Sequence, residues 1–121
     1  MSMGLKFDHK IAIAISVAVI IIIGVAWMYV NSPIEVTDAD RAVYLCIFLC
    51  KASANEGLSM DDGPCLSSGS PAWEVENWVC DVAHWPREDV DNLPVNQCPE
   101  YGSTAHHFVE VNPGCGFIRS I

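Results

Sequence analysis

The chain has 121 residues, of which 51% are hydrophobic, and a formal net charge of −9 at pH 7. This acidity argues against nucleic acids and anionic lipid headgroups as partners, because both carry negative charge. The hydrophobic residues and the acids are unevenly distributed. One long apolar stretch comes first, and fourteen of the fifteen Asp and Glu residues follow it. The sequence therefore predicts an apolar segment followed by one small acidic domain, with no nucleic-acid partner.

Residues 11–30 form an apolar run without a charged residue or a proline: IAIAISVAVIIIIGVAWMYV. A helix of this length spans about 30 Å, which is the thickness of the hydrocarbon core of a bilayer. Its isoleucines and valines favour insertion by on the order of 3–7 kcal/mol. Trp27 and Tyr29 lie at one end, where aromatic rings prefer the membrane–water boundary. We therefore expect a transmembrane helix over residues 11–30, with the lipid bilayer as its partner.

The flanking cations predict the orientation of this helix. Lys6 and Lys10 precede the run, and only Arg41 follows it closely. Positively charged flanks stay in the cytoplasm. We therefore expect a cytoplasmic tail over residues 1–10 and a single-pass protein of the cell membrane, with its C-terminal domain outside.

Other interpretations of the apolar run remain open. Gly24 and Ala26 are small enough for the cleavage site of a signal peptide. Cleavage after Gly4 would instead give a pilin-like filament subunit, in which the apolar helix packs against copies of itself. Self-association within the membrane is a further interpretation, because small residues four apart let a second helix approach closely. Two pairs have this spacing: Ala12 with Ser16, and Ala14 with Ala18.

All six cysteines follow the apolar run. An even number confined to the predicted outer domain is typical of three disulfides formed in an oxidising compartment. No C-x-x-C pair is present, which argues against a zinc ribbon, a thioredoxin-like redox site and a c-type haem. We expect structural disulfides and no cofactor, and the sequence does not choose the pairing of Cys46, Cys50, Cys65, Cys80, Cys98 and Cys115.

A linker over residues 31–36, in which Pro33 ends the first helix, leads into the domain over residues 37–121. The sequence predicts a second helix from about residue 38 to residue 55, with Thr37 as its N-cap and Gly57 as its stop. Cys46 and Cys50 are one helical turn apart, so their side chains point in parallel. We therefore expect each of them to pair with a cysteine elsewhere and to attach the helix to the rest of the domain.

The remainder of the domain combines short strands with long connections. Residues 57–72 are rich in turn-forming residues, and residues 86–105 form a long acidic loop held by Cys98. Three segments have the alternation or the β-branched content of strands: residues 76–84, 107–111 and 116–120. The predicted fold class is α+β: an N-terminal transmembrane helix, then a disulfide-stapled domain with one main helix and a short antiparallel sheet.

Histidines beside acids are the candidate metal ligands. The candidates are His84, His106 and His107, together with Asp81 or Glu110. Adjacent histidines on a strand point to opposite faces, so His106 and His107 would not serve the same site. The acidic run over residues 88–92 lacks the spacing and the glycine of an EF-hand, and we expect it to be a solvated loop.

No catalytic residues are predicted. The sequence has no G-x-S-x-G motif and no glycine-rich phosphate loop, and the cysteines are expected to be oxidised. The three tryptophans after the apolar run, at positions 73, 78 and 85, are interpreted as core residues. We therefore do not expect an enzyme.

Three stretches carry a resemblance: GPCLSS at 63–68, WVCDVAHWPREDVDNLPVNQC at 78–98, and HHFVEVNPGC at 106–115. They resemble small membrane-anchored cysteine-rich proteins of archaea. The resemblance implies a hydrophobic N-terminal segment before a cysteine-rich domain, and it implies no activity. The expected function is a membrane-anchored extracytoplasmic binding or assembly module. The alternatives are the pilin-like subunit and an extracytoplasmic metal-binding or enzymatic domain.

Overall fold

The computed structural model describes residues 8–121. The chain divides between Glu35 and Val36 into two units, which we describe separately. The first unit contains helix α1, His9–Val30. Asp8 caps this helix by accepting a hydrogen bond from the backbone N–H of Lys10 at 3.2 Å. Lys6 and Gly4, on which the predicted orientation and one cleavage alternative depend, lie outside the described residues.

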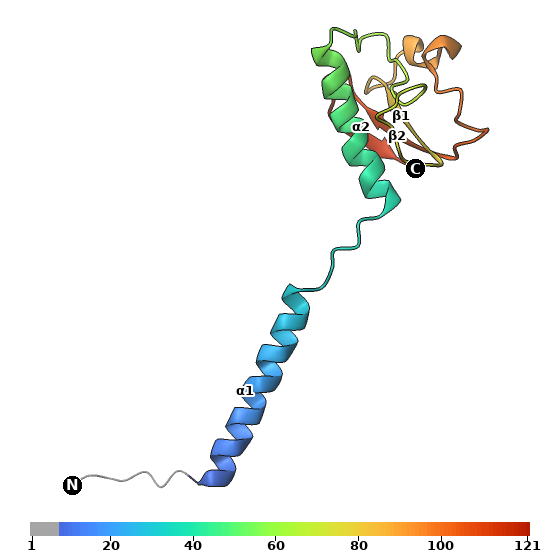
Figure 1. The fold of residues 1–121 in the computed structure, drawn as a ribbon. Helices are drawn as coiled ribbons and strands as arrows, with labels where there is room; N and C mark the ends of the chain where they lie inside the picture. The colour runs from blue at the N-terminus through green and yellow to red at the C-terminus, as the bar shows by residue number, and fades with distance from the viewer. Residues whose placement is uncertain (1–7) are drawn as a thin grey trace. The chain divides into compact units, whose positions relative to one another are not determined.

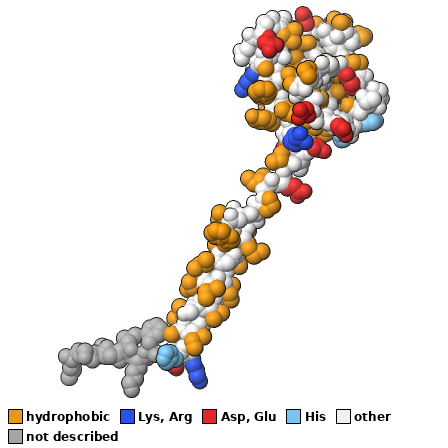
Figure 2. All heavy atoms as spheres, in the orientation of Figure 1, with side chains coloured by type: hydrophobic (Ala, Val, Ile, Leu, Met, Phe, Trp, Pro, Cys, Tyr) orange, Lys and Arg blue, Asp and Glu red, His pale blue; other side chains and the backbone are white. Residues whose placement is uncertain are grey.

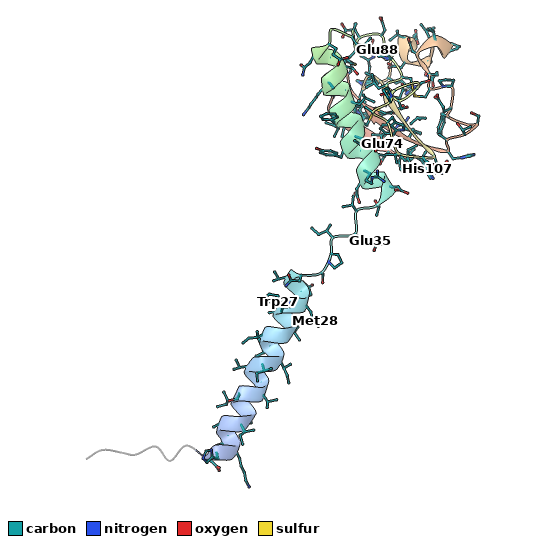
Figure 3. The ribbon with its side chains drawn as sticks, in the orientation of Figure 1. Trp27, Met28, Glu35, Glu74, Glu88 and His107 are labelled. Atoms are coloured by element: carbon teal, nitrogen blue, oxygen red, sulfur yellow. A yellow bond between two sulfur atoms is a disulfide. The ribbon has the colours of Figure 1, made fainter. Side chains whose placement is uncertain are left out.

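Helix α1 carries apolar side chains along the face seen in Figure 2, and none of its side chains is buried. Trp27 and Met28 project outward near its C-terminal end and are 69% and 74% exposed (Figure 3). The hydroxyl of Ser16 donates to the carbonyl of Ala12 at 2.9 Å, so this polar group is satisfied within the helix. The helix is long and apolar enough to cross a membrane. It has no apolar stripe facing a core, unlike the helices of soluble domains.

The second unit begins with helix α2, Asp38–Asn55, whose bounds agree with the prediction. Thr37 and Asp40 form a capping box: the Thr37 hydroxyl accepts from the Asp40 N–H at 3.2 Å, and the Asp40 carboxylate accepts from the Thr37 N–H at 3.1 Å. After α2 the chain turns at Gly57, where φ is +92°, a backbone conformation that favours glycine. The predicted N-cap is confirmed.

The sheet has three strands in the order β1-β2-β3: Trp78–Val82, His107–Val111 and Phe117–Ser120. β2 and β3 are antiparallel, but β1 and β2 are parallel, from Trp78 opposite His107 to Val82 opposite Val111. The predicted antiparallel sheet is therefore wrong, and the sheet is mixed. A parallel pair needs a long crossover, and residues 83–106 provide one. This crossover contains two short 3₁₀ helices: η1, Asp89–Asn92, and η2, Pro94–Asn96.

One face of the sheet packs against α2 (Figure 1). The helix contributes residues at helical spacing, and β1 and β2 contribute alternate residues. Together they form the main core: Ala42, Cys46, Leu49 and Cys50 from α2, and Cys80, Val82, Val109 and Val111 from the strands. The disulfides Cys46–Cys80 and Cys50–Cys115 join this helix to the sheet side of the domain. The expectation that Cys46 and Cys50 pair elsewhere is confirmed.

The opposite face of the sheet is covered by the crossover. Val79 of β1 and Phe108 of β2 pack there with Cys98, which comes from the crossover. Cys98 forms the third disulfide with Cys65. The segment that contains Cys65 also lies along the free edge of β1, where the Leu66 N–H donates to the Cys80 carbonyl at 2.9 Å. The third disulfide therefore holds the crossover over this second face, which contains the candidate site.

Candidate functional site: a carboxylate cavity on the second face of the sheet

Three charged side chains form a row across the second face of the sheet. Asp81 on β1 is the register partner of Glu110 on β2, which is in turn the partner of Arg119 on β3. Residues at one level of a sheet point to the same face, and neighbouring strands lie about 4.8 Å apart. The two carboxyl groups therefore stand side by side on the face of the sheet that the crossover covers.

The carboxylate of Glu110 is fully paired. Arg87 donates from Nη1 to Oε1 at 2.7 Å, and Arg119 donates from Nε to Oε2 at 2.6 Å. The bond to Glu110 raises the pKa of Arg119 further. Arg87 also donates to the side chain of Asn92 at 2.8 Å and to the carbonyl of Asp91 at 3.2 Å, so the crossover fixes its position. Each oxygen of Glu110 therefore accepts from one arginine.

Asp81 has no such partner. It is 8% exposed, and its Oδ1 atom is buried without a hydrogen bond. Burial, followed by the neighbouring charge of Glu110, raises the pKa of Asp81 to about 8, although Arg87 acts in the opposite direction. Asp81 therefore carries a proton over most of the range around neutral pH.

A cavity of about 150 Å³ lies beside this carboxyl group. In liquid water this volume would hold about five molecules. The rings of Tyr101 and Phe108 meet edge to face with centroids 5.3 Å apart, and the guanidinium carbon of Arg119 lies 5.1 Å from the Phe108 centroid. The cavity has space for one compact polar group. Its lining residues are Val79, Asp81, Arg87, Gln97, Cys98, Tyr101, Phe108, Glu110 and Arg119.

A separate acidic group supports the crossover from within. Asp91 is only 1% exposed and accepts hydrogen bonds from the backbone N–H groups of His84 at 3.0 Å and Glu88 at 2.8 Å. Its Oδ1 also accepts from Nδ1 of His84 at 2.9 Å. The expectation of a solvated loop is therefore wrong at Asp91, although Glu88 is exposed (Figure 3).

This pair is charged at mildly acidic pH. The hydrogen bond with Asp91 raises the pKa of His84. Burial acts to raise the pKa of Asp91, but the hydrogen bonds from Glu88 and His84 outweigh it, and the pKa lies below its ordinary value. The arrangement orders the crossover above the cavity.

The structure places the predicted metal ligands in different surroundings. His84 lies beyond the end of β1 with Asp91, while His106 lies near the start of β2 and bonds to Asn77 at 2.9 Å. His107 stacks on Trp78 with centroids 4.7 Å apart. The register separates His84 from His107 by about 20 Å along the strands. Within residues 8–121, no three His, Cys, Asp or Glu residues form a group suited to a metal ion.

Sequence reasoning included Asp81 among the candidates but did not find its surroundings. Arg87 and Gln97 lie apart in the crossover and Arg119 lies on β3, and no local pattern joins them. One signal was present: the strands WVCDV and HFVEV each carry one acid at the same position within an apolar run. Such an acid is costly to bury without a compensating partner.

No protein-family model, curated protein or solved structure matches this chain. The resemblance to archaeal membrane-anchored proteins therefore stays a prediction. The functional argument depends on the geometry of the second face of the sheet and on the two units themselves.

Proposed function

We propose that this chain is a single-pass membrane protein whose disulfide-stapled outer domain binds a small ligand in the Asp81 cavity. The observation that carries the proposal is the unpartnered oxygen of Asp81, which lies next to an acid that two arginines already neutralise. A buried acceptor without a partner costs about 1–3 kcal/mol. Asp81 lines the cavity, so a ligand that donates a hydrogen bond to its carboxyl group gives this group a partner, which favours binding.

Two features support the membrane location. The side chains of α1 are exposed on all sides, so the helix needs an apolar environment that the described residues do not provide. All six cysteines are paired, which fits a domain in an oxidising compartment. Lipid around α1 and an extracytoplasmic position for residues 37–121 satisfy both.

Fractionation of cells that express the full chain tests the location. We expect the chain to stay in carbonate-washed membranes at its full mass, and we expect protease added outside the membrane to digest residues 37–121. Replacing Ile21 and Ile22 by lysine should release the chain, because each buried lysine costs about 2.5–3.5 kcal/mol at the centre of a span. The matched control replaces the same residues by leucine and should stay in the membrane.

Other results would refute the proposed location. A soluble chain shortened within residues 1–30 would identify α1 as a cleaved signal peptide. Filaments in electron micrographs of the purified protein would favour the pilin-like alternative, in which copies of α1 cover one another. A domain protected from external protease would contradict the predicted orientation.

Binding is tested with small probes that differ only in their polar group. Methylammonium, acetamide and acetate each fit a cavity of about 150 Å³. NMR spectra of the full chain in nonionic detergent report binding through the aromatic protons of Tyr101 and Phe108, which line this cavity. Saturable shifts with any of the three probes support a ligand site. The binding proposal fails if none of the three probes shifts these signals at concentrations up to 50 mM. A dissociation constant of 50 mM corresponds to a binding free energy of about −2 kcal/mol.

A further inference from the structure

We propose that the ligand of this cavity carries a compact ammonium group, which binds the carboxylate of Asp81 beside the arginine-paired Glu110. This inference rests on the proposed function and narrows it to one class of ligand. It starts from an asymmetry in the row of charges: Glu110 is paired with two arginines, whereas Asp81 has a buried oxygen with no partner.

The charges around Asp81 are mixed, so the carboxylate of Asp81 itself is what favours a cation here. The negative charges of Glu110 on β2 and Asp91 on η1 act on Asp81, and the positive charge of Arg87 in the crossover opposes them. Arg119, on β3, is hydrogen-bonded to Glu110 and lies on the side of Glu110 away from Asp81. The domain adds to this field, since residues 31–121 hold fourteen acids and four Lys or Arg residues.

A metal ion fits the cavity poorly. Divalent cations with oxygen ligands need several carboxylate or carbonyl oxygens. Both oxygens of Glu110 already accept from arginines, which leaves Asp81 as the one free carboxyl group among the described residues that line the cavity. An ammonium group needs fewer partners, because each of its N–H bonds can be satisfied by one acceptor or by an aromatic ring.

The lining offers suitable partners for an ammonium group besides Asp81. The amide nitrogen of Gln97 donates to the carbonyl of Asp91, so the amide oxygen of Gln97 is the part of this side chain left to accept. The rings of Tyr101 and Phe108 form the apolar part of the wall. The volume of about 150 Å³ limits the bound group to a short alkylammonium or to the end of a longer amine.

Binding of this kind exchanges a proton for the ligand. Protonated Asp81 releases its proton to the solvent, and the resulting carboxylate accepts hydrogen bonds from the ammonium group, which keeps its own three protons. Since the pKa of Asp81 is about 8, affinity should fall roughly 50-fold from pH 8 to pH 6, and about 0.9 proton should be released per ligand at pH 7. The amine stays charged throughout, because its own pKa is near 10.

The experiment is a titration of the full chain in nonionic detergent with methylammonium chloride, followed by the aromatic signals of Tyr101 and Phe108. The test variant is Asp81→Asn, which removes the charge at nearly constant volume. The control is Asp62→Asn, which removes the same charge from an exposed turn. We expect Asp81→Asn to weaken binding at least tenfold and Asp62→Asn to leave it unchanged. Amide spectra and disulfide content confirm that each variant is folded.

The wild-type chain keeps the test decisive if Asp81→Asn does not fold. Calorimetry at pH 7 in two buffers of different ionisation enthalpy measures proton release directly. No proton release, or equal affinity at pH 6 and pH 8, overturns the inference. Acetate or acetamide binding as tightly as methylammonium overturns the inference and leaves the proposed ligand site intact. If no probe binds, the inference and the proposed binding function both fail.

Discussion

Replacing Asp81 by asparagine should change how the stability of the domain depends on pH. In the unfolded chain this carboxyl group ionises near pH 4, whereas burial and Glu110 raise its pKa to about 8 in the folded domain. Below pH 4 the group is protonated in both states and has no effect on the free energy of unfolding. Between pH 4 and pH 8 the unfolded state loses the proton and the folded state keeps it. Stability therefore falls as pH rises, and the loss levels off above pH 8.

The shift in pKa sets the size of this effect. One pKa unit corresponds to about 1.36 kcal/mol. Raising the pKa of Asp81 to about 8 on folding therefore lowers the free energy of unfolding at high pH by on the order of 5 kcal/mol. Relaxation of the cavity and water entry reduce this figure, and we expect about 2–5 kcal/mol. Asparagine does not titrate. The variant should be close to the wild type in stability at pH 4 and more stable than it by this amount at pH 9.

Urea unfolding of the full chain in nonionic detergent, followed by tryptophan fluorescence from pH 4 to pH 9, measures the effect. The quantity compared is the difference in unfolding free energy between variant and wild type, because other groups that titrate in both chains cancel. Asp62→Asn provides the baseline for removing an exposed acid. A difference that stays constant across this range would refute a buried, proton-bearing Asp81.

Three further predictions concern the crossover that covers the cavity. Replacing Cys65 and Cys98 by alanine removes a cross-link between residues 33 apart, which should cost about 3–4 kcal/mol in urea unfolding and abolish probe binding; unchanged binding would show that the cavity does not need this disulfide. Gly63→Ala should lower the melting temperature, because φ is +65° there and the added Cβ would lie 2.6 Å from Oδ1 of Asp91; an unchanged melting temperature contradicts this packing. Asp91→Asn should lower the pKa of His84 toward 6.5 in NMR titrations, because its hydrogen-bonded charge is lost; a pKa that does not move would mean that the pair is absent in solution.

Local signals were enough to predict the helices and most of the strands. Thr37 and Gly57 mark the ends of α2 through capping and backbone preference, which depend on neighbouring residues only. The even count of cysteines and the parallel side chains of Cys46 and Cys50 led correctly to disulfides that leave the helix. These inferences needed no knowledge of how distant segments meet.

The sheet and the site depend on distant segments, and there the sequence was insufficient. Alternation identifies a strand but not the direction of its partner, so the parallel pairing of β1 with β2 was missed. Asp91 looks like any other acid in the run over residues 88–92, because its burial depends on His84 and on the path of the crossover. The pairing of Glu110 with Arg87 and Arg119, which leaves Asp81 alone, is also a property of the folded domain.

Disulfide mapping of the full chain, isolated from washed membranes and alkylated without reductant, tests the account most directly. Both the location and the cavity under the crossover depend on an outer domain that is oxidised in the membrane-bound protein. We expect no alkylated cysteine and three linked peptide pairs: Cys46–Cys80, Cys50–Cys115 and Cys65–Cys98. Six alkylated cysteines in the full-length chain, or its recovery in the soluble fraction alone, would contradict the account.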